Sequence, residues 1–367
     1  MAHCRKQLVS ILPSASCNLN CRYCYNPTFR KIKPEHQRID IDFAIAGIRD
    51  FFDSNESRMI RYYSAGEPSI AFEEMKIIRD EANKMAGGDL RVELQTNGCF
   101  NEEVASWVDK YSDVVWISYD GPQEIQDRNH LTKAGTGSHA IVTKNIREFV
   151  KNKKMQFGVR ATVDPIDFHR LNEILDYFKS LGIKYACLAS VFSSTALGSD
   201  TKKLRLLDFA KEFAKSFHYA QSIGMFIQTH LIFNFDEKVK IACRACTPCP
   251  HLTPDGYVTC CDETSLGPGY LPGLLQELTY GKWDPRTKKI KYFPEKIKRI
   301  RVRNICNLKR EECKTCSILE NCAGGCIPKS FYVTKDMYTP SEEVCEATQY
   351  LATKIPLNQG RFPFLHS

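Results

Sequence analysis

The 367-residue chain lacks any run of about eighteen apolar residues, the length that a membrane-spanning helix requires. Its first residues, Met-Ala-His-Cys-Arg-Lys-Gln, include no apolar stretch of the kind that directs secretion. It has no internal repeat and no low-complexity tract. The net charge of +8 is modest for this length, so it permits an acidic partner without requiring one. We therefore expect a cytoplasmic protein that binds neither membranes nor nucleic acids.

Cysteine, in contrast, is abundant: the chain has 17, and most of them fall in clusters. In a secreted protein so many cysteines would indicate disulfides, but an export signal is lacking. The spacings inside the clusters are those of metal ligands. The cysteines therefore predict iron–sulfur ligation in a reducing compartment, together with sensitivity to oxygen.

Three cysteines lie close together near the start of the chain, in the stretch Ser-Ala-Ser-Cys-Asn-Leu-Asn-Cys-Arg-Tyr-Cys-Tyr, and they are Cys17, Cys21 and Cys24. A 4Fe–4S cluster usually takes four cysteine ligands, so three leave one iron open, and an open position is typical of a reactive metal centre. A zinc knuckle is the alternative. Zinc would require a fourth Cys or His nearby, and none lies between Cys24 and His36.

Residues 1–235 alternate between short apolar strands and amphipathic helices, which predicts a parallel sheet with crossover helices. The expected strands are 7–12, 59–63, 90–95, 114–118, 156–163 and 185–189. The expected helices are 41–52, 70–85, 102–111, 140–151, 171–181 and about 204–223. Six such units predict an α/β fold with a partial, TIM-like (β/α)6 barrel, open along one side, whose chemistry lies at the C-terminal ends of the strands. After residue 235 the periodicity fades, so 236–367 is expected to be a second domain that needs metal or disulfides to fold.

The first cysteine triplet resembles the signature of the radical S-adenosylmethionine (radical SAM) superfamily. In that family the open iron binds the amino and carboxylate groups of the cofactor's methionine. An electron from the cluster then cleaves the sulfonium and releases a deoxyadenosyl radical. The resemblance implies an oxidoreductase that receives electrons from an external reductant such as flavodoxin or ferredoxin.

Segments at the ends of the predicted strands resemble those that line the cofactor pocket in this family. Ser64-Ala65-Gly66-Glu67-Pro68 resembles its Gly-Gly-Glu-Pro motif, where the glycine lets a ligand approach and the glutamate accepts from the methionine ammonium group. Arg160 is expected to pair with the methionine carboxylate, because a buried arginine needs a partner. The remaining expected cofactor residues are Tyr23 and Leu188 near adenine and Thr96, Asn97, Ser118 and Asp120 on the pocket wall. The role of the arginine in the family's Asp-x-x-Arg is taken by Arg128 or His130, or it is lost in this chain.

The second domain carries two further groups of cysteines, which with Gly256 resemble the SPASM extension of radical SAM enzymes. That extension holds two auxiliary 4Fe–4S clusters. Carried over by the resemblance, the ligands of one cluster are Cys313, Cys316, Cys322 and Cys345, and those of the other are Cys243, Cys246, Cys261 and Cys326. Alternatives to the predicted ligands are Cys249, Cys260 and Cys306, whereas Cys4, Cys99 and Cys187 are expected to be buried thiols. Structural zinc remains the alternative for the whole domain.

The resemblance implies an enzyme that modifies a peptide. After hydrogen abstraction, forming a new bond requires the loss of an electron, which an auxiliary cluster can accept, and of a proton, which needs a base. Asp262 matches the position of the proposed base in anaerobic sulfatase maturases. We expect an oxidative cross-link, thioether or carbon–carbon, in a ribosomally made precursor peptide.

Other functions stay open. A sulfatase maturase, which converts Cys or Ser to formylglycine, fits Asp262, although Glu263-Thr264-Ser265 does not resemble that family's aromatic continuation. A peptide epimerase would use a spare cysteine as hydrogen donor. An electron carrier or a zinc-stapled scaffold would lack the residues expected to bind methionine. The first strand begins near residue 7, so leader recognition is expected at the barrel mouth, on a separate protein, or on the basic stretch 282–303, which is otherwise a solvated face.

Overall fold

The computed structural model describes residues 7–24, 32–63, 65–191, 206–270 and 273–358. Its eleven strands form one continuous sheet in the order β11-β10-β9-β8-β1-β2-β3-β4-β5-β6-β7. The strands are β1 Val9–Ile11, β2 Met59–Tyr62, β3 Arg91–Thr96, β4 Val114–Ser118, β5 Gln156–Val163, β6 Tyr185–Ser190, β7 Phe226–Gln228, β8 His251–Leu252, β9 Tyr257–Thr259, β10 Thr279–Asp284 and β11 Lys289–Tyr292.

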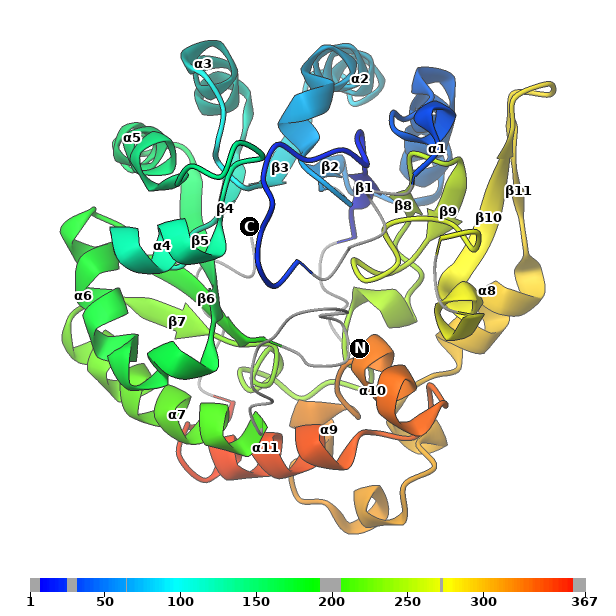
Figure 1. Ribbon diagram of the computed structural model, residues 1–367. Helices are drawn as coiled ribbons and strands as arrows, with labels where there is room; N and C mark the ends of the chain where they lie inside the picture. Colours follow the sequence, from blue (N-terminus) through cyan, green and yellow to red (C-terminus); the bar gives the residue numbers. More distant parts are fainter. Residues whose placement is uncertain (1–6, 25–31, 64, 192–205, 271–272, 359–367) are drawn as a thin grey trace.

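The helices of the first half surround the curved sheet on its outer side (Figure 1). The α-helices are α1 Ile41–Ser54, α2 Phe72–Met85, α3 Glu102–Tyr111, α4 Gln123–Asn129, α5 His139–Phe149, α6 Leu171–Ser180, α7 Leu206–Ser222, α8 Pro294–Arg301, α9 Leu319–Cys322, α10 Ile327–Thr334 and α11 Glu342–Ala352. The 3-10 helices are η2 Pro34–His36, η3 Pro68–Ala71, η4 Pro165–Arg170, η5 Arg244–Cys246, η6 Gly273–Leu278, η7 Ile305–Asn307 and η8 Glu311–Thr315.

Strands β1 to β7 are parallel and follow one another in chain order, as a partial barrel requires. All six predicted strands are present. The structure adds a short seventh parallel strand, β7, and the helix α4, neither of which the sequence analysis expected. The predicted α/β barrel is therefore confirmed, with one more strand at its open edge.

Successive side chains along each strand point to opposite faces of the barrel wall. On β5, Val159, Ala161 and Val163 are buried in the main core, whereas Arg160 is exposed. The outer face thus packs under the helices, and the inner face remains open to solvent at this point. Helix α1 shows why the covering helices form: Asp40 caps its first turn by accepting from the backbone N–H of Phe43 at 3.2 Å.

The C-terminal part extends the sheet of the barrel directly. Strand β8 pairs in parallel with β1, placing His251 beside Ser10, and then turns into the antiparallel strands β9 to β11. Gly47 on α1 makes room for this joint, because a Cβ there would lie 2.6 Å from Leu252 Cδ1. The expected domain boundary at residue 235 stays a prediction, since the sheet is continuous across it.

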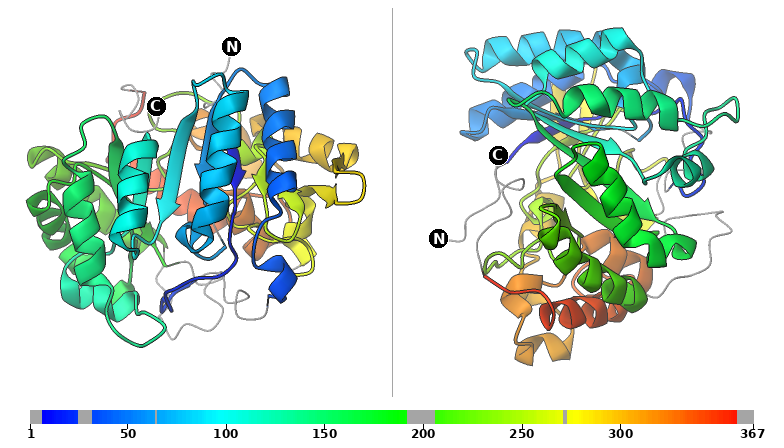
Figure 2. Two further views of the ribbon diagram at one scale, coloured as in Figure 1. Left: turned by 90° about the horizontal axis from the view of Figure 1, so that it is seen from above. Right: turned by 90° about the vertical axis from the view of Figure 1, so that its left-hand side faces the viewer.

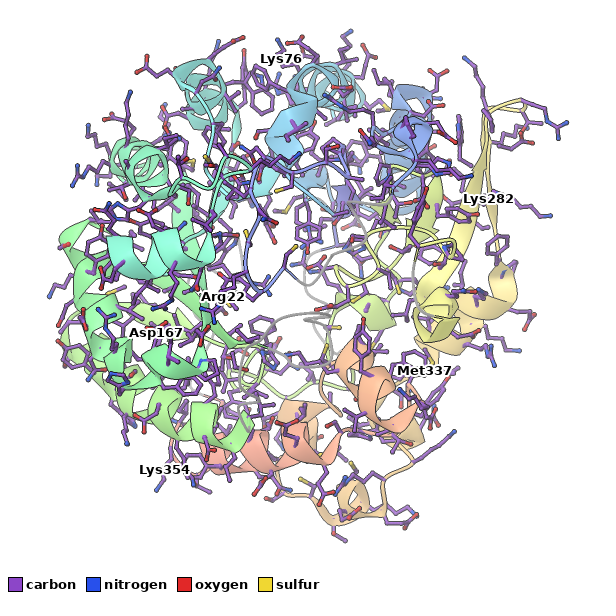
Figure 3. All side chains as sticks on the ribbon, viewed as in Figure 1. Arg22, Lys76, Asp167, Lys282, Met337 and Lys354 are labelled. Atoms are coloured by element: carbon purple, nitrogen blue, oxygen red, sulfur yellow. The ribbon has the colours of Figure 1, made fainter. Side chains whose placement is uncertain are left out.

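At the other edge, α11 packs beside α7, and the backbone N–H of Leu206 donates to Glu343 Oε1 at 2.8 Å (Figure 2). The basic stretch 282–303 forms β10, β11 and α8 on the far side, where Lys282 points away from the body (Figure 3). No helix in the described ranges is long and apolar enough to cross a membrane. Every cysteine among the described residues is a free thiol.

Candidate active site

The cysteine loop follows β1 and is pinned to the end of β2. The backbone N–H of Glu67 donates to the carbonyl oxygen of Ser16, directly before Cys17, at 2.8 Å. A Cβ at Gly66 would lie 2.0 Å from that same oxygen, so only glycine permits the contact. The glycine was expected to admit a ligand, and the structure shows that it admits the backbone of the cysteine loop. Ser64, the first residue of the motif, lies outside the described residues, as does Cys4.

Glu67 is buried, and its carboxylate joins the ends of β2 and β3. It accepts from Thr96 Oγ1 at 2.6 Å, from the backbone N–H of Asn97 at 2.7 Å and from that of Ser69 at 3.0 Å. Burial raises the pKa of Glu67 although these donors oppose it. These contacts make Glu67 a residue that holds the pocket wall, and its contact with the cofactor's ammonium group stays a prediction.

The thiol of Cys17 lies among polar groups in the same corner. The backbone N–H of Leu19 lies 3.4 Å from its sulfur, and Asn97 Nδ2 lies 3.8 Å away while also donating to Asn18. Burial, and then the carboxylate of Glu67, raise the pKa of Cys17 to about 12. A thiol in such surroundings ionises only against strong positive charge, which a metal centre supplies. The donor set therefore fits an iron–sulfur cluster held by Cys17, Cys21 and Cys24.

The second thiol contacts a buried polar network. Cys21 Sγ lies 3.3 Å from Nδ1 of His130, and the other ring nitrogen lies 2.6 Å from the Tyr23 hydroxyl. That hydroxyl donates to Asp120 Oδ2 at 2.5 Å, and Asp120 also accepts from the backbone N–H of Thr162 at 2.9 Å. Burial opposes a charged imidazole, but Cys21 and Asp120 hold the pKa of His130 well above its usual value.

The two predicted alternatives have different surroundings. His130 lies against the cysteine loop, whereas Arg128 forms an ion pair with Asp167, and which of them meets the cofactor stays a prediction. The predicted contact of Tyr23 with adenine stays a prediction, and the structure adds that its hydroxyl fixes the loop to Asp120. The sequence analysis did not foresee this fixing role. The tyrosine hydroxyl next to a predicted cysteine ligand was the only signal.

Three further predicted residues divide between the two faces of the barrel wall. Arg160 and Ser118 are in register on neighbouring strands and share the inner face, as expected for residues near a ligand. Leu188 is in register with the buried Ala161 and is itself fully buried in the core under the helices. Its predicted contact with adenine does not fit this placement, because its side chain is on the outer face.

The C-terminal cysteines include two sets whose members affect one another or line one pocket. In one group, the thiol of Cys243 hydrogen-bonds Cys246 and lowers the pKa of Cys246 to about 6. Burial raises the pKa of Cys261 well above its usual value, and the neighbouring charges of Cys326 and Cys243 add to this effect. The other group lines a pocket, and its members are Cys313, Cys316, Cys322 and Cys345.

Of the spare cysteines, Cys260 has a pKa raised by burial, and it lies close enough to Cys243 and Cys249 for their charges to raise that pKa further. Cys249 Sγ donates to the carbonyl oxygen of Leu8 at 3.0 Å and fastens the segment before β8 to β1. Cys260 is buried, and Cys306 is exposed. Throughout the described ranges, no three Cys, His, Asp or Glu side chains surround a point where one metal ion could be held. A 4Fe–4S cluster is larger than one ion, so the two thiol groups remain candidates for cluster ligands, and their assignment stays a prediction.

Asp262, the predicted base, is fixed to the barrel by two side chains that the sequence analysis missed. Both guanidinium nitrogens of Arg61 contact its carboxylate, and His251 Nε2 lies 2.8 Å from Oδ1. Arg61, 6% exposed on β2, also donates to Ser10 Oγ at 2.9 Å. Burial opposes ionisation, but Arg61 and His251 hold the pKa of Asp262 well below its usual value. An arginine inside the apolar strand 59–62 was the signal that could have revealed this site.

Comparison with known proteins finds similarity over part or most of the chain. Residues 11–178 match the Radical SAM superfamily. The cysteine-type anaerobic sulfatase-maturating enzyme of Clostridium perfringens is 24% identical over 339 residues, which cover 85% of this chain and 86% of that protein. The serine-type enzyme of Klebsiella aerogenes is 21% identical over 327 residues, which cover 85% of this chain and 77% of that protein.

Solved structures share the fold over nearly the whole chain. Native anSMEcpe with bound AdoMet has a TM-score of 0.73 at 20% identity, covering 95% of this chain and 96% of its own. Streptococcus suis SuiB bound to its precursor peptide SuiA has a TM-score of 0.66 at 16% identity, covering 94% of this chain and 76% of its own. The family's cofactors are a 4Fe–4S cluster and S-adenosylmethionine. Residues 11–178 thus form a radical SAM domain, and the chain is similar over most of its length to anaerobic sulfatase-maturating enzymes and shares its fold with SuiB.

Proposed function

We propose that this enzyme oxidises one residue of a peptide or protein substrate. The observation that carries the proposal is the position of Asp262. It directly follows a cysteine of the first auxiliary group and is locked to β2 of the radical SAM domain by Arg61. A candidate base and a candidate electron acceptor are thus built into one short segment beside the barrel. An enzyme that only produced radicals, without oxidising its substrate, would need neither.

The residues of the barrel would bind and orient the reactants. Cys17, Cys21 and Cys24 would hold the cluster, which together with S-adenosylmethionine supplies a deoxyadenosyl radical that removes a hydrogen atom from the substrate. Glu67 and His130 keep the cysteine loop in place through the contacts described above. Both are buried, so they exclude water from this side of the pocket.

The substrate must then lose one proton and one electron to complete a two-electron oxidation. Asp262 is ionised and its side chain is 36% exposed, so a carboxylate oxygen would receive the proton, although Arg61 and His251 lower its pKa and make it a weaker base than an ordinary aspartate. Cys243, Cys246, Cys261 and Cys326 would hold a cluster that supplies an acceptor for the electron. An external reductant such as a flavodoxin or ferredoxin would supply the electron that starts each cycle.

Two outcomes fit this scheme. One is the oxidative cross-link in a ribosomal peptide expected from the sequence, and the shared fold with SuiB, which was solved with its precursor peptide SuiA, supports a peptide substrate for it. Formylglycine formation is the second candidate, because the sulfatase-maturating enzyme of C. perfringens aligns over 85% of this chain and Asp262 resembles the proposed base of that family in its position after a cysteine. An epimerase is less well supported, since Cys249 is engaged with Leu8 and Cys306 is on the surface.

The test is anaerobic turnover of the reconstituted enzyme with two substrates, analysed by mass spectrometry. One is the Cp18Cys peptide bound in a structure of anSMEcpe, and the other is any short peptide encoded beside this gene. An aldehyde in the first supports formylglycine formation, whereas loss of two hydrogen atoms in the second supports a cross-link.

The variant Asp262→Asn tests the base, with the exposed Asp53→Asn as a matched control. It should still form deoxyadenosine but lose the oxidised product. Full product formation by Asp262→Asn would show that Asp262 is not the base.

A further inference from the structure

The largest fully buried side chain among the described residues is an arginine close to the C-terminal cysteines. Arg303 follows α8 and is 0% exposed. Its guanidinium donates three hydrogen bonds, all to backbone carbonyl oxygens: Nη1 to Ala323 at 2.9 Å, Nη2 to Gly324 at 2.8 Å and Nε to Met337 at 3.1 Å. Met337 lies beyond the end of α10 (Figure 3). The guanidinium is thus held on three sides, and its charge has no access to water.

Two of these carbonyl oxygens belong to the turn that joins two predicted cluster ligands. Cys322 ends α9 and Cys326 directly precedes α10, and the turn 323–325 lies between them. Every residue of this turn has a positive φ, between 48° and 78°, which a residue other than glycine, such as Ala323, rarely adopts. Cys322 is predicted to bind one auxiliary cluster and Cys326 the other. The arginine therefore holds the turn through which the two predicted clusters are connected.

The backbone next to Arg303 also contacts the segment that carries the first two ligands of the other predicted cluster. The backbone N–H of Ile305 donates to the carbonyl oxygen of Lys240 at 3.0 Å, and Cys243 follows shortly after Lys240 in the chain. Helix α8 packs against η5, the short helix that includes Cys246. Arg303 is thus located where the segments of both predicted cysteine groups meet.

The charge of Arg303 acts on thiols of both groups. Burial raises the pKa of Cys313 and that of Cys322, and the cation of Arg303 opposes the rise in each. In the other group, the hydrogen bond from Cys243 is the first cause of the lowered pKa of Cys246, and Arg303 lowers that pKa further against the effect of burial. One permanently charged side chain thus favours the thiolate form of cysteines in both groups.

The buried cation has no carboxylate partner. Across the described ranges, the polar contacts of the Arg303 side chain are the three carbonyl oxygens, and no ion pair is among them. A carbonyl oxygen accepts a hydrogen bond but carries no net charge, and a buried charge without a partner of opposite sign is costly. A 4Fe–4S cluster with four thiolate ligands is an anion. The surroundings of Arg303 therefore fit the negative charge that the two cysteine groups would acquire with clusters bound.

We propose that Arg303 is a positioning residue for both auxiliary clusters: its hydrogen bonds hold the turn between Cys322 and Cys326, and its charge stabilises the reduced state of the cluster on either side. This rests on the proposed function, which takes the two cysteine groups to hold clusters. The sign follows from the charges. A reduced cluster is more negative than an oxidised one, so a nearby cation raises its reduction potential, and removal of the cation lowers it.

The test is a redox titration of the reconstituted enzyme, followed by electron paramagnetic resonance and compared with its variants. Arg303→Gln keeps a side-chain N–H donor but is neutral. We expect it to make both auxiliary clusters at least about tenfold poorer electron acceptors, a fall of about 59 mV in potential for one electron. Arg303→Lys keeps the charge and should retain the potentials of the unmodified enzyme. Arg301→Gln, at an exposed position on the same segment, should leave them unchanged.

Unchanged auxiliary potentials in Arg303→Gln with full iron content would overturn the proposal, because a residue that only supports the fold has no effect on the potential. Equal shifts in Arg303→Gln and Arg303→Lys, or in Arg303→Gln and Arg301→Gln, would overturn it as well, since the buried charge would then not be the cause. If Arg303→Gln retains no iron, Arg303→Lys decides. Full iron content with unshifted potentials supports the role of the charge, whereas loss of iron or shifted potentials overturn it.

The same preparations separate this role from the proposed function. About four iron atoms per chain in the unmodified enzyme, enough for one cluster, would exclude the auxiliary clusters and overturn the proposal with them. Oxidised peptide from an enzyme whose auxiliary potentials do not depend on Arg303 would count against this role alone. Potentials that shift as expected, in an enzyme that oxidises no peptide, would count against the proposed function alone.

Discussion

Replacing Gly66 by alanine tests how the cysteine loop is positioned. The added Cβ would lie 2.0 Å from Ser16 O and 2.4 Å from Ser16 C, both backbone atoms that cannot rotate away. Reaching an ordinary contact of about 3.2 Å from the present 2.0 Å requires a shift of roughly 1.2 Å in the backbone next to Cys17. The shift would also break the hydrogen bond from Glu67 to Ser16.

The size of the effect follows from these two costs. Strain from overpacking costs about 1–3 kcal/mol and the lost hydrogen bond about 1 kcal/mol, so the free energy of unfolding should fall by about 2–4 kcal/mol. A displacement of about 1 Å at a reacting group typically costs about 100-fold in rate. We therefore expect Gly66→Ala to form deoxyadenosine at least about 100-fold more slowly than the unmodified enzyme.

The assay is anaerobic reconstitution followed by measurement of iron content, thermal unfolding and the rate of deoxyadenosine formation. Gly269→Ala is the matched control, because nothing lies within 4 Å of a Cβ at that position. It should behave like the unmodified enzyme in all three measurements. A rate for Gly66→Ala within about threefold of the control would refute the reasoning, because it would show that the loop tolerates the displacement.

Three more substitutions probe other parts of the account. Asp120→Asn removes a buried carboxylate that accepts hydrogen bonds from Tyr23 and Thr162, so it should lower the free energy of unfolding by about 2–4 kcal/mol. The control Asp109→Asn, at an exposed position, should change the free energy of unfolding little. Equal effects of the two substitutions in denaturant titrations would contradict this prediction. Arg61→Met and Asp262→Asn should be coupled by about 1–3 kcal/mol in a double-mutant cycle of unfolding, and additive effects would show that the ion pair does not fix the base. Cys345→Ala should lower iron content by about four atoms per chain while deoxyadenosine still forms, and unchanged iron would remove Cys345 from the ligands.

The fold could be predicted well because its signals are local. Each strand of the first half is a short apolar run, and each helix repeats its apolar residues at helical spacing, so six β/α units were readable in order. Helix α4 was missed because its seven residues are too few to show a period. Strand β7 was missed for the same reason, since it has three residues and forms only by pairing with β6.

The same difference between local and long-range signals explains which parts of the candidate site could be predicted. The cysteine triplet and the strand ends were visible because their chemistry depends on residues close together in the chain. The contacts that hold Asp262 could not be predicted, because they form only when β8 pairs with β1. That pairing brings His251 beside Arg61, although the two residues are 190 positions apart in the sequence. Leu188 shows the limit of residue-level reasoning: a shift of one residue along β6 exchanges the inner and outer faces, and no residue type marks which face is which.

The central claim is that the cysteine loop holds a cluster with one open iron that binds and cleaves S-adenosylmethionine. The most direct measurement is the yield of deoxyadenosine and methionine after reduced, anaerobically reconstituted enzyme is mixed with the cofactor. The account predicts equal amounts of both products, and none from a variant in which Cys17, Cys21 and Cys24 are all alanine. Absence of deoxyadenosine from the intact enzyme, or its undiminished formation by the triple variant, would contradict the account.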